Sequence, residues 1–224
     1  MPRTAREKSK TGIYHIVLRG INKQRIFEEN EDCQKFLSTL KKYKFTSEYE
    51  IYGYCLMSNH IHLLMKEGKE DLGIVFRRIG ASFVYWYNWK YNRFGHLFQD
   101  RFKSEAVETT QYFLTALRYI HQNPVKAGIA KVDSYHWSSY CEYVKGSVLC
   151  NTAFALSFFS EDTGKAIEQF KKFNLEENKD RCLEYEDGAR LNDEEATEII
   201  KAIGKVKSPV EILSITKEMK LYKN

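Results

Sequence analysis

Apolar and polar residues alternate in several short stretches of the first half of the chain, and this alternation predicts strands. Residues 12–20 read GIYHIVLRG, and residues 50–57 and 60–66 are similarly short and rich in β-branched or aromatic side chains. A polar break at 58–59 separates the last two stretches, which is typical of an antiparallel hairpin. A loop and a further strand are expected within 93–108.

Three longer stretches repeat apolar residues every three or four positions, which predicts helices with one buried side. They cover residues 31–45, 71–89 and 110–123, and Asn30 is a candidate N-cap for the first. Pro124 follows the third stretch and is expected to end or kink that helix. The resulting order is β-α-β-β-α-β followed by a helix. It predicts an α+β fold of the split βαβ type, an antiparallel sheet with helices packed on one face.

The last third of the chain has a different pattern, because it lacks strong strand signals. Short helices are expected there, with start signals at 192–195 (NDEE) and 208–211 (SPVE). We therefore place a boundary near 147–152. The predicted regions are a first domain at 1–147 and a helical accessory region at 148–224, which could serve DNA recognition, packing or oligomerisation.

Composition places the chain among soluble intracellular proteins. Its 224 residues are 43% hydrophobic, which is enough for a core of ordinary size. Five cysteines lie at irregular spacings without a CxxC pair, which favours reduced thiols over a disulfide framework or a zinc ribbon. No apolar segment approaches the length of a membrane span, so we expect a cytoplasmic protein without a membrane partner.

Positive charge is concentrated in the first two thirds of the chain. Residues 1–150 carry 23 Lys and Arg against 15 Asp and Glu, a balance of +8. Residues 151–224 carry 12 against 15, a balance of −3, and the two add to the net charge of +5. A basic region that also contains many tyrosines and phenylalanines suggests a polyanionic partner, although many basic proteins bind no nucleic acid.

The segment NHIHLL contains the first candidate functional residues. Side chains two residues apart in a strand point the same way, so His60 and His62 share a face while Ile61 points into the opposite layer. Two imidazoles at this spacing can converge on one divalent ion. The alternative is a pair of surface histidines on a half-exposed strand. The apolar surroundings favour a metal or catalytic site, because buried imidazoles without partners would cost free energy.

A tyrosine on the third predicted helix is the second candidate. Tyr119 and Asn123 are four residues apart and therefore neighbours on the helix, whereas His121 falls on roughly the opposite side. On spacing alone, Tyr119 is more simply explained as a half-buried aromatic residue. However, a phenol that attacks a phosphodiester near pH 7 needs a cation that polarises the phosphoryl oxygens. A histidine pair, a later tyrosine and a basic surface together supply the parts of that chemistry.

Several ordered segments then point to one family. NHIHLL matches the His-hydrophobe-His (HUH) motif of single-strand nucleases. Together with GIYHIVLRGINKQRIF, GHLFQDRFKS and YFLTALRYIHQNPVKAG, it makes residues 8 to 145 closely resemble the IS200-like single-tyrosine transposases, and among them the REP-associated tyrosine transposases of bacteria. The resemblance implies a ferredoxin-like HUH nuclease fold and a nucleoid-associated protein. It also implies cleavage of single-stranded or hairpin DNA through a 5′-phosphotyrosyl intermediate that leaves a free 3′-OH.

Carried over by position, the resemblance makes Tyr119 the nucleophile, with Tyr112 one helical repeat earlier as its rival. His60 and His62 would be ligands to Mg²⁺ or Mn²⁺, and Asn123 would supply a third ligand. An amide oxygen beside two imidazoles suits Mn²⁺ at least as well as Mg²⁺, which prefers oxygen ligands. The sequence leaves open whether the tyrosine serves the histidines of its own chain or those of a partner in a homodimer.

The basic residues of this region become candidates for phosphate contacts, although each is about as easily explained as a solvated side chain. Together they would give DNA binding that weakens steeply with salt. The candidates are Arg3, Arg6, Lys10, Arg19, Lys23, Arg25, Arg77, Arg78, Arg93, Arg101 and Lys103.

Three other interpretations account for parts of the same sequence. A cupin-like metal enzyme would use His60, His62 and Glu67 at the cupin spacing, but the helix predicted after Gly68 contradicts an all-β barrel. A replication initiator or relaxase nickase would share the chemistry but has a different motif order. A non-catalytic DNA-binding descendant of a transposase would use the same fold to regulate or bridge hairpins, and the intact histidines and tyrosine argue against it.

Overall fold

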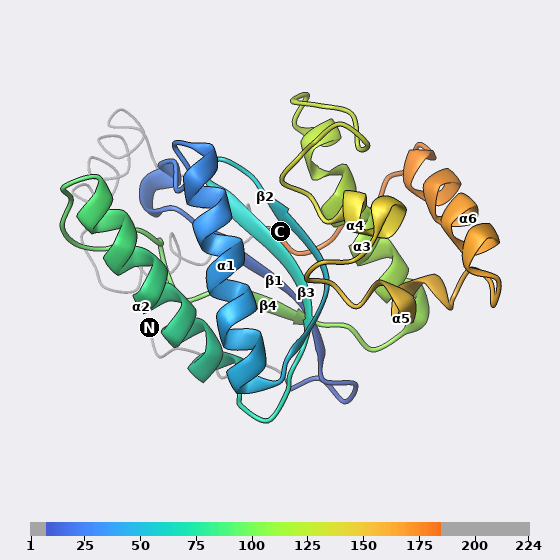
Figure 1. Cartoon of the computed structure of the whole chain (residues 1–224), viewed down its shortest axis with the longest axis horizontal. Helices are drawn as coiled ribbons and strands as arrows, with labels where there is room; N and C mark the ends of the chain where they lie inside the picture. Colours follow the sequence, from blue (N-terminus) through green and yellow to red (C-terminus); the bar gives the residue numbers. More distant parts are fainter. Residues whose placement is uncertain (1–7, 185–224) are drawn as a thin grey trace, which may run out of the picture. The chain divides into compact units, whose positions relative to one another are not determined.

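A four-stranded antiparallel sheet forms the centre of the computed structural model, which describes residues 8–184 (Figure 1). The strands are β1 (Ile13–Arg19), β2 (Glu50–Leu56), β3 (His60–Lys66) and β4 (Lys103–Ala106), in the spatial order β2-β3-β1-β4. Every neighbouring pair is antiparallel. This arrangement confirms the predicted α+β fold and all four predicted strands.

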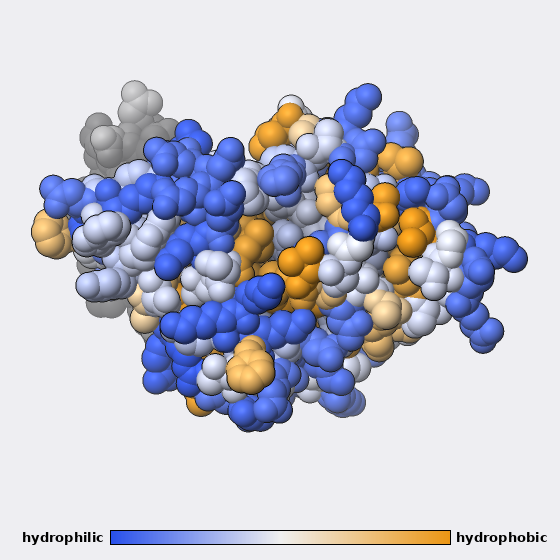
Figure 2. All heavy atoms as spheres, in the orientation of Figure 1, coloured by the Kyte–Doolittle hydropathy of each residue, from blue (hydrophilic) through white to orange (hydrophobic). Residues whose placement is uncertain are grey.

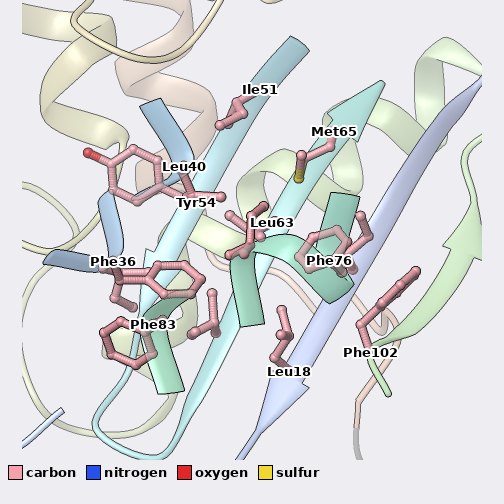
Figure 3. Close-up of a cluster of buried hydrophobic side chains, with 14 of the residues drawn as sticks. Leu18, Phe36, Leu40, Ile51, Tyr54, Leu63, Met65, Phe76, Phe83 and Phe102 are labelled. Atoms are coloured by element: carbon pink, nitrogen blue, oxygen red, sulfur yellow. The ribbon is translucent and has the colours of Figure 1, made fainter. Parts of the chain in front are cut away.

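Two long helices cover one face of the sheet, α1 (Asn30–Ser47) and α2 (Leu72–Lys90). Alternate residues of the strands point toward them and form a hydrophobic core with side chains of both helices (Figure 3). The cluster includes Leu18 of β1, Leu63 and Met65 of β3, Phe36 and Leu40 of α1, and Phe76 and Phe83 of α2.

The opposite face of the sheet is covered by α3 (Thr110–Lys126), as Figure 1 shows. The expectation of helices on one face therefore holds for α1 and α2 only. Sequence periodicity shows that a helix has a buried side, but it does not say which face of a sheet that side meets. This second face carries the site described below.

Three shorter helices extend the layer around α3. They are α4 (Tyr140–Lys145), α5 (Thr152–Leu156) and α6 (Thr163–Leu175), and a short 3-10 helix, η1 (Ile21–Lys23), follows β1. Leu156 of α5 and Phe170 of α6 are buried in the same cluster as Phe113 and Leu117 of α3. The chain up to α6 is therefore built around one sheet.

The helix ends differ from the sequence predictions in two places. The N-cap of α1 is Glu29, one residue before the predicted Asn30, because Glu29 forms a capping box with Asp32. Helix α3 continues through Pro124 to Lys126. Proline is tolerated there because only two residues of the helix follow it, so the disturbance that it causes is confined to the last turns.

The chain divides into two compact units, residues 1–185 and residues 186–224. The domain boundary near 147–152 stays a prediction. The predicted helix starts at 192–195 and 208–211 lie outside the described residues, as do Arg3 and Arg6. No helix within residues 8–184 is both long and apolar enough to cross a membrane.

Candidate active site

Three histidines lie side by side on the sheet face that α3 covers. His60 and His62 of β3 share one face, as predicted from strand alternation, and Ile61 points into the opposite core; the shared face is the one that α3 covers. The neighbouring strand β1 contributes His15, whose ring stacks on that of His62 with a centroid distance of 5.3 Å. His15 and His62 are buried, and His60 is half-buried.

Helix α3 brings the side chain of Asn123 between the two histidines of β3. The Nε2 atom of His60 lies 3.2 Å from the Oδ1 atom of Asn123, and the Nε2 atom of His62 lies 3.2 Å from its Nδ2 atom. The structure thus brings together the three residues that the sequence proposed as metal ligands. Their role as ligands stays a prediction.

The donor set fits a divalent cation of intermediate hardness. Among the described residues, no group of three or more His, Cys, Asp or Glu side chains is placed to hold a metal, so the third protein ligand would have to be the Asn123 amide. Two imidazole nitrogens and one amide oxygen would suit Mn²⁺ at least as well as Mg²⁺, which prefers oxygen ligands. The remaining positions would be open to phosphate oxygens or water.

Burial keeps both β3 histidines neutral at neutral pH, which is the state that binds a metal. Desolvation lowers the pKa of His60, and Arg19 lowers it further, while the hydrogen bond to Asn123 opposes the change. The pKa of His62 is lowered well below the ordinary value, first by burial and then by the neighbouring His15 and His60.

His15 is the residue that the sequence analysis missed. Its Nε2 atom lies 3.1 Å from the Nδ1 atom of His62, and burial lowers its pKa to about 3. The signal was present, since His15 is the single polar residue inside the otherwise apolar stretch IYHIVL and a strand places it two residues from Val17 on the same face. It could not be tied to His62 without the pairing of β1 with β3.

Tyr119 lies beside this cluster on α3. Its ring meets those of His15 and His62 edge-on, at centroid distances of 6.0 Å and 5.7 Å. Its hydroxyl donates to a carboxylate oxygen of Glu184. Burial is the main cause that raises the pKa of Tyr119, and the contact with Glu184 raises it further. The Nζ atom of Lys126 lies 4.1 Å from the ring centroid.

Tyr112, the rival nucleophile, and His121 form hydrogen bonds away from the β3 histidines. Tyr112 donates its hydroxyl to Glu105 of β4, away from the β3 histidines. His121 is buried on the other side of α3, with its Nδ1 atom 3.1 Å from Asn174 and its Nε2 atom 2.8 Å from the hydroxyl oxygen of Ser139. Neither residue shares the cluster around Asn123.

Residues 176–184 run along α3 and cover Tyr119. Arg118 donates from Nε and Nη2 to the two carboxylate oxygens of Asp180, at 2.7 Å and 3.0 Å. Lys126 donates to the backbone carbonyl of Asp180 at 2.9 Å. This strap, defined here as residues 176–184, ends with the Glu184 carboxylate on the tyrosine hydroxyl. Tyr119 is consequently only 2% exposed.

Several of the side chains predicted to contact phosphates already bind other side chains of the protein. Arg78 donates to both carboxylate oxygens of Glu70, at 2.7 Å and 3.0 Å. Arg93 donates to the side chain of Gln24 at 3.0 Å. Arg25 lies 3.3 Å from a carboxylate of the same loop. The bidentate pair of Arg78 indicates a structural role, because its donors already have a partner.

Other predicted contacts lie near the histidine cluster or on the surface. Arg19 pairs in register with His60 across β1 and β3. Arg77 and Arg101 line a cavity of about 620 Å³ between α2 and residues 95–102. Hydrophilic side chains occupy most of the face in Figure 2, and the hydrophobic residues on it form separate patches. The exposed lysines of the predicted set are Lys10, Lys23 and Lys103.

Comparisons with known proteins give a consistent result. The family described as "Transposase IS200 like" matches residues 8–123, slightly more than half of the chain. A solved structure described as a REP-associated tyrosine transposase bound to a REP hairpin is similar at 22% identity and a TM-score of 0.56, over 64% of this chain and 86% of that one. At this identity the likeness shows the fold alone.

A second structure is more distant. It is described as a putative transposase from Deinococcus radiodurans R1, at 11% identity and a TM-score of 0.38, over 58% of this chain and 100% of that one. No curated protein matches the sequence.

Proposed function

The chain belongs to the IS200-like transposase family, and we propose that it cleaves and rejoins single-stranded or hairpin DNA through a covalent bond to Tyr119. One observation carries this proposal: the Asn123 amide lies between the Nε2 atoms of His60 and His62, with the Tyr119 ring beside them. One chain supplies all four residues, so the proposed site does not require a second chain.

In the proposed reaction, the hydroxyl oxygen of Tyr119 attacks the scissile phosphorus of DNA. The new P–O bond joins the 5′ end to the tyrosine as the bond from phosphorus to the 3′ oxygen breaks. The phenol would first have to leave Glu184; it then releases its proton to solvent, and the departing 3′ oxygen takes one from solvent. Attack by a 3′-OH on the phosphotyrosine reverses these steps and rejoins a strand.

His60, His62 and Asn123 would hold Mg²⁺ or Mn²⁺, which when bound polarises phosphoryl oxygens and neutralises their charge. Before any ion binds, the chain already keeps both imidazoles neutral by burial. The Tyr119 ring lies edge-on beside His62, which would limit the directions from which its hydroxyl oxygen could approach a phosphate at these ligands. Positioning the nucleophile in advance lowers the entropic cost of bringing it and the phosphate together in the transition state.

A DNA hairpin is the proposed substrate class for two reasons. The similar solved structure is that of a transposase bound to a REP hairpin. The balance of +8 over residues 1–150 also favours a polyanion. Exposed residues such as Lys10, Lys23 and Lys103 would contact phosphates, and binding would weaken with rising salt.

The alternative function is a non-catalytic hairpin-binding regulator derived from a transposase. The contact between the Tyr119 hydroxyl and Glu184 favours it, because the candidate nucleophile is covered by its own chain. In that case the fold would bind hairpins while the tyrosine stays unreactive.

A covalent-adduct assay distinguishes the two functions. The full-length protein is incubated with a labelled hairpin oligonucleotide and Mn²⁺ or Mg²⁺, and the products are separated on a denaturing gel. We expect a metal-dependent, SDS-resistant protein–DNA band that Tyr119→Phe and His62→Ala abolish and that Tyr112→Phe retains. Loss in Tyr112→Phe alone would move the nucleophile to Tyr112. Tight hairpin binding without an adduct would support the regulator.

A further inference from the structure

In each histidine of the β3 pair, the Nε2 atom faces Asn123, and the other ring nitrogen, Nδ1, lies within hydrogen-bond distance of a different neighbour. The Nδ1 atom of His60 lies 2.7 Å from Oδ1 of Asn59, and the Nδ1 atom of His62 lies 3.1 Å from Nε2 of His15. We infer that Asn59 and His15 are positioning residues that hold the protons of His60 and His62 on Nδ1. Both Nε2 lone pairs are then directed at Asn123.

A neutral imidazole carries one proton and one lone pair, so the partner of one nitrogen decides what the other offers. A nitrogen that keeps its proton cannot bind a metal. Neighbours that accept from the remote nitrogen of a ligating histidine also fix the orientation of the ring. This inference rests on the proposed metal site, and it names the residues that make that site competent.

The Asn59 contact is fixed by a second hydrogen bond. The Nδ2 atom of Asn59 donates to the backbone carbonyl of Lys23 at 3.3 Å. Its Oδ1 atom therefore faces His60 and can only accept. Nδ1 of His60 must then be the donor, which leaves the lone pair on Nε2.

Opposite this lone pair stands the Oδ1 atom of Asn123, at 3.2 Å. Two acceptors facing each other at this distance repel, and a cation between them removes the repulsion. If the Asn123 amide were rotated by 180°, its Nδ2 atom would face His60 and its Oδ1 atom would face Nε2 of His62. The two facing acceptors would then be at His62, provided that His62 also keeps its proton on Nδ1.

His15 supplies that condition for His62. In the inferred arrangement, Nε2 of His15 accepts from Nδ1 of His62, and the proton of His15 then resides on its own Nδ1 atom. This atom is buried and has no hydrogen-bond partner within residues 8–184. An unsatisfied buried nitrogen is unfavourable for stability, so a role in folding does not explain the histidine at position 15. A role in orienting His62 does.

The two positioning residues differ in burial, and this difference predicts unequal effects. His15 is fully buried, whereas Asn59 is partly exposed, so water can take the place of Asn59 but not of His15. Removing the acceptor at position 15 should therefore weaken metal binding more than removing the one at position 59.

The test is a Mn²⁺ titration of the full-length protein without DNA, followed by the EPR signal of free Mn²⁺. We expect His15→Leu to weaken Mn²⁺ binding roughly 10–100-fold, the range found for partners of metal ligands. His15→Gln, whose amide oxygen reaches the same place as Nε2, should retain most of the affinity. Asn59→Ala should have a smaller effect than His15→Leu.

Thermal melting separates positioning from structural damage. Within residues 8–184, the ring of His15 has an unpaired buried nitrogen, and His15→Leu would instead leave an unpaired nitrogen on the ring of His62. We therefore expect little change in melting temperature beside the loss of Mn²⁺ affinity. Equal Mn²⁺ affinity in His15→Leu and the wild type would overturn the inference. If His62→Ala also binds Mn²⁺ normally, the proposed metal site itself is wrong.

A spectroscopic measurement covers the case in which His15→Leu does not fold. Long-range ¹H–¹⁵N spectra of the wild type saturated with Mg²⁺ report which ring nitrogen of each histidine carries the proton. The inference requires protons on Nδ1 of both His60 and His62. A proton on Nε2 of His62 under these conditions would contradict it.

Discussion

Tyr119 is restrained by a residue far away in the sequence. Its hydroxyl donates to the carboxylate of Glu184, which raises the pKa of the phenol beyond the effect of burial. The same carboxylate would repel an incoming phosphate. We expect Glu184→Gln to speed the formation of the DNA adduct several-fold and to shift its pH dependence toward lower pH, because the phenol loses the charge that disfavours its ionisation. Single-turnover rates measured between about pH 6 and 9 check this.

The strap supplies a matched control for this prediction. Glu176 is also on the strap, but its side chain is 52% exposed, and its carboxylate lies 3.8 Å from Nη1 of Arg118. Glu176→Gln removes the same charge without touching Tyr119 and should leave the adduct rate unchanged. A slower reaction in Glu184→Gln would instead identify this carboxylate as the base that receives the phenol proton.

The residue scale also shows where sequence reasoning stops. His60 and His62 could be assigned to one face because a strand has a period of two, and Tyr119 and Asn123 to one side of a helix because four residues make about one turn. His15 contacts His62 from the neighbouring strand β1, and Glu184 contacts Tyr119 from the strap. No local period connects residues so far apart.

Strand β2 and helix α3 meet at a glycine, which sets how closely the helix approaches the sheet. A Cβ atom at Gly53 would lie 2.7 Å from Cδ1 of Leu117, inside a buried cluster. We expect Gly53→Ala to lower the free energy of unfolding by about 1–3 kcal/mol. Adduct formation should fall as well, because α3 carries Tyr119 and Asn123. Denaturant unfolding and the adduct assay measure the two effects.

A second substitution and a second glycine make this test specific. Leu117→Val shortens the side chain that would clash, so the double variant should recover part of the loss seen in Gly53→Ala, and a double-mutant cycle measures that coupling. Gly80 of α2 is the control, because nothing lies within 4 Å of a Cβ atom placed there. Gly80→Ala should stabilise the protein by up to about 1 kcal/mol. Additive effects of Gly53→Ala and Leu117→Val would mean that the close approach does not position α3.

Elements were the most predictable scale, since the first three strands and the three long helices follow from the pattern of apolar residues, and the fourth strand lies within the stretch 93–108 where one was expected. Their assembly was less predictable. The periodicity of α3 gave its buried side but not the face of the sheet that it covers. In the sequence, Gly53 is only one residue of a predicted strand. Its close approach to Leu117 depends on tertiary packing, which the sequence pattern does not show.

At the scale of the molecule, the segment after residue 147 belongs to the core. Glu142 accepts hydrogen bonds from the backbone amides of Val148, Leu149 and Cys150, at 2.8 to 2.9 Å. Phe170 of α6 is fully buried and stacks on Tyr143 at a centroid distance of 4.4 Å. Sequence composition marked this part as different, but composition reports charge and strand content, not burial.

A chain that ends at residue 147 should therefore not fold stably, whereas one that ends at residue 184 should. Burial of Phe170 alone contributes about 1.5–3 kcal/mol, and the shorter chain also loses the buried Ala155 and Leu156. A combined loss of several kcal/mol approaches the roughly 5–15 kcal/mol that stabilises a whole domain. Thermal unfolding followed by circular dichroism should show a cooperative transition for residues 1–184 and none for residues 1–147. Phe170→Ala in the full chain, expected to cost about 3–5 kcal/mol, confirms that the loss comes from packing. Cooperative unfolding of residues 1–147 near the melting temperature of the full chain would restore the boundary that the sequence suggested.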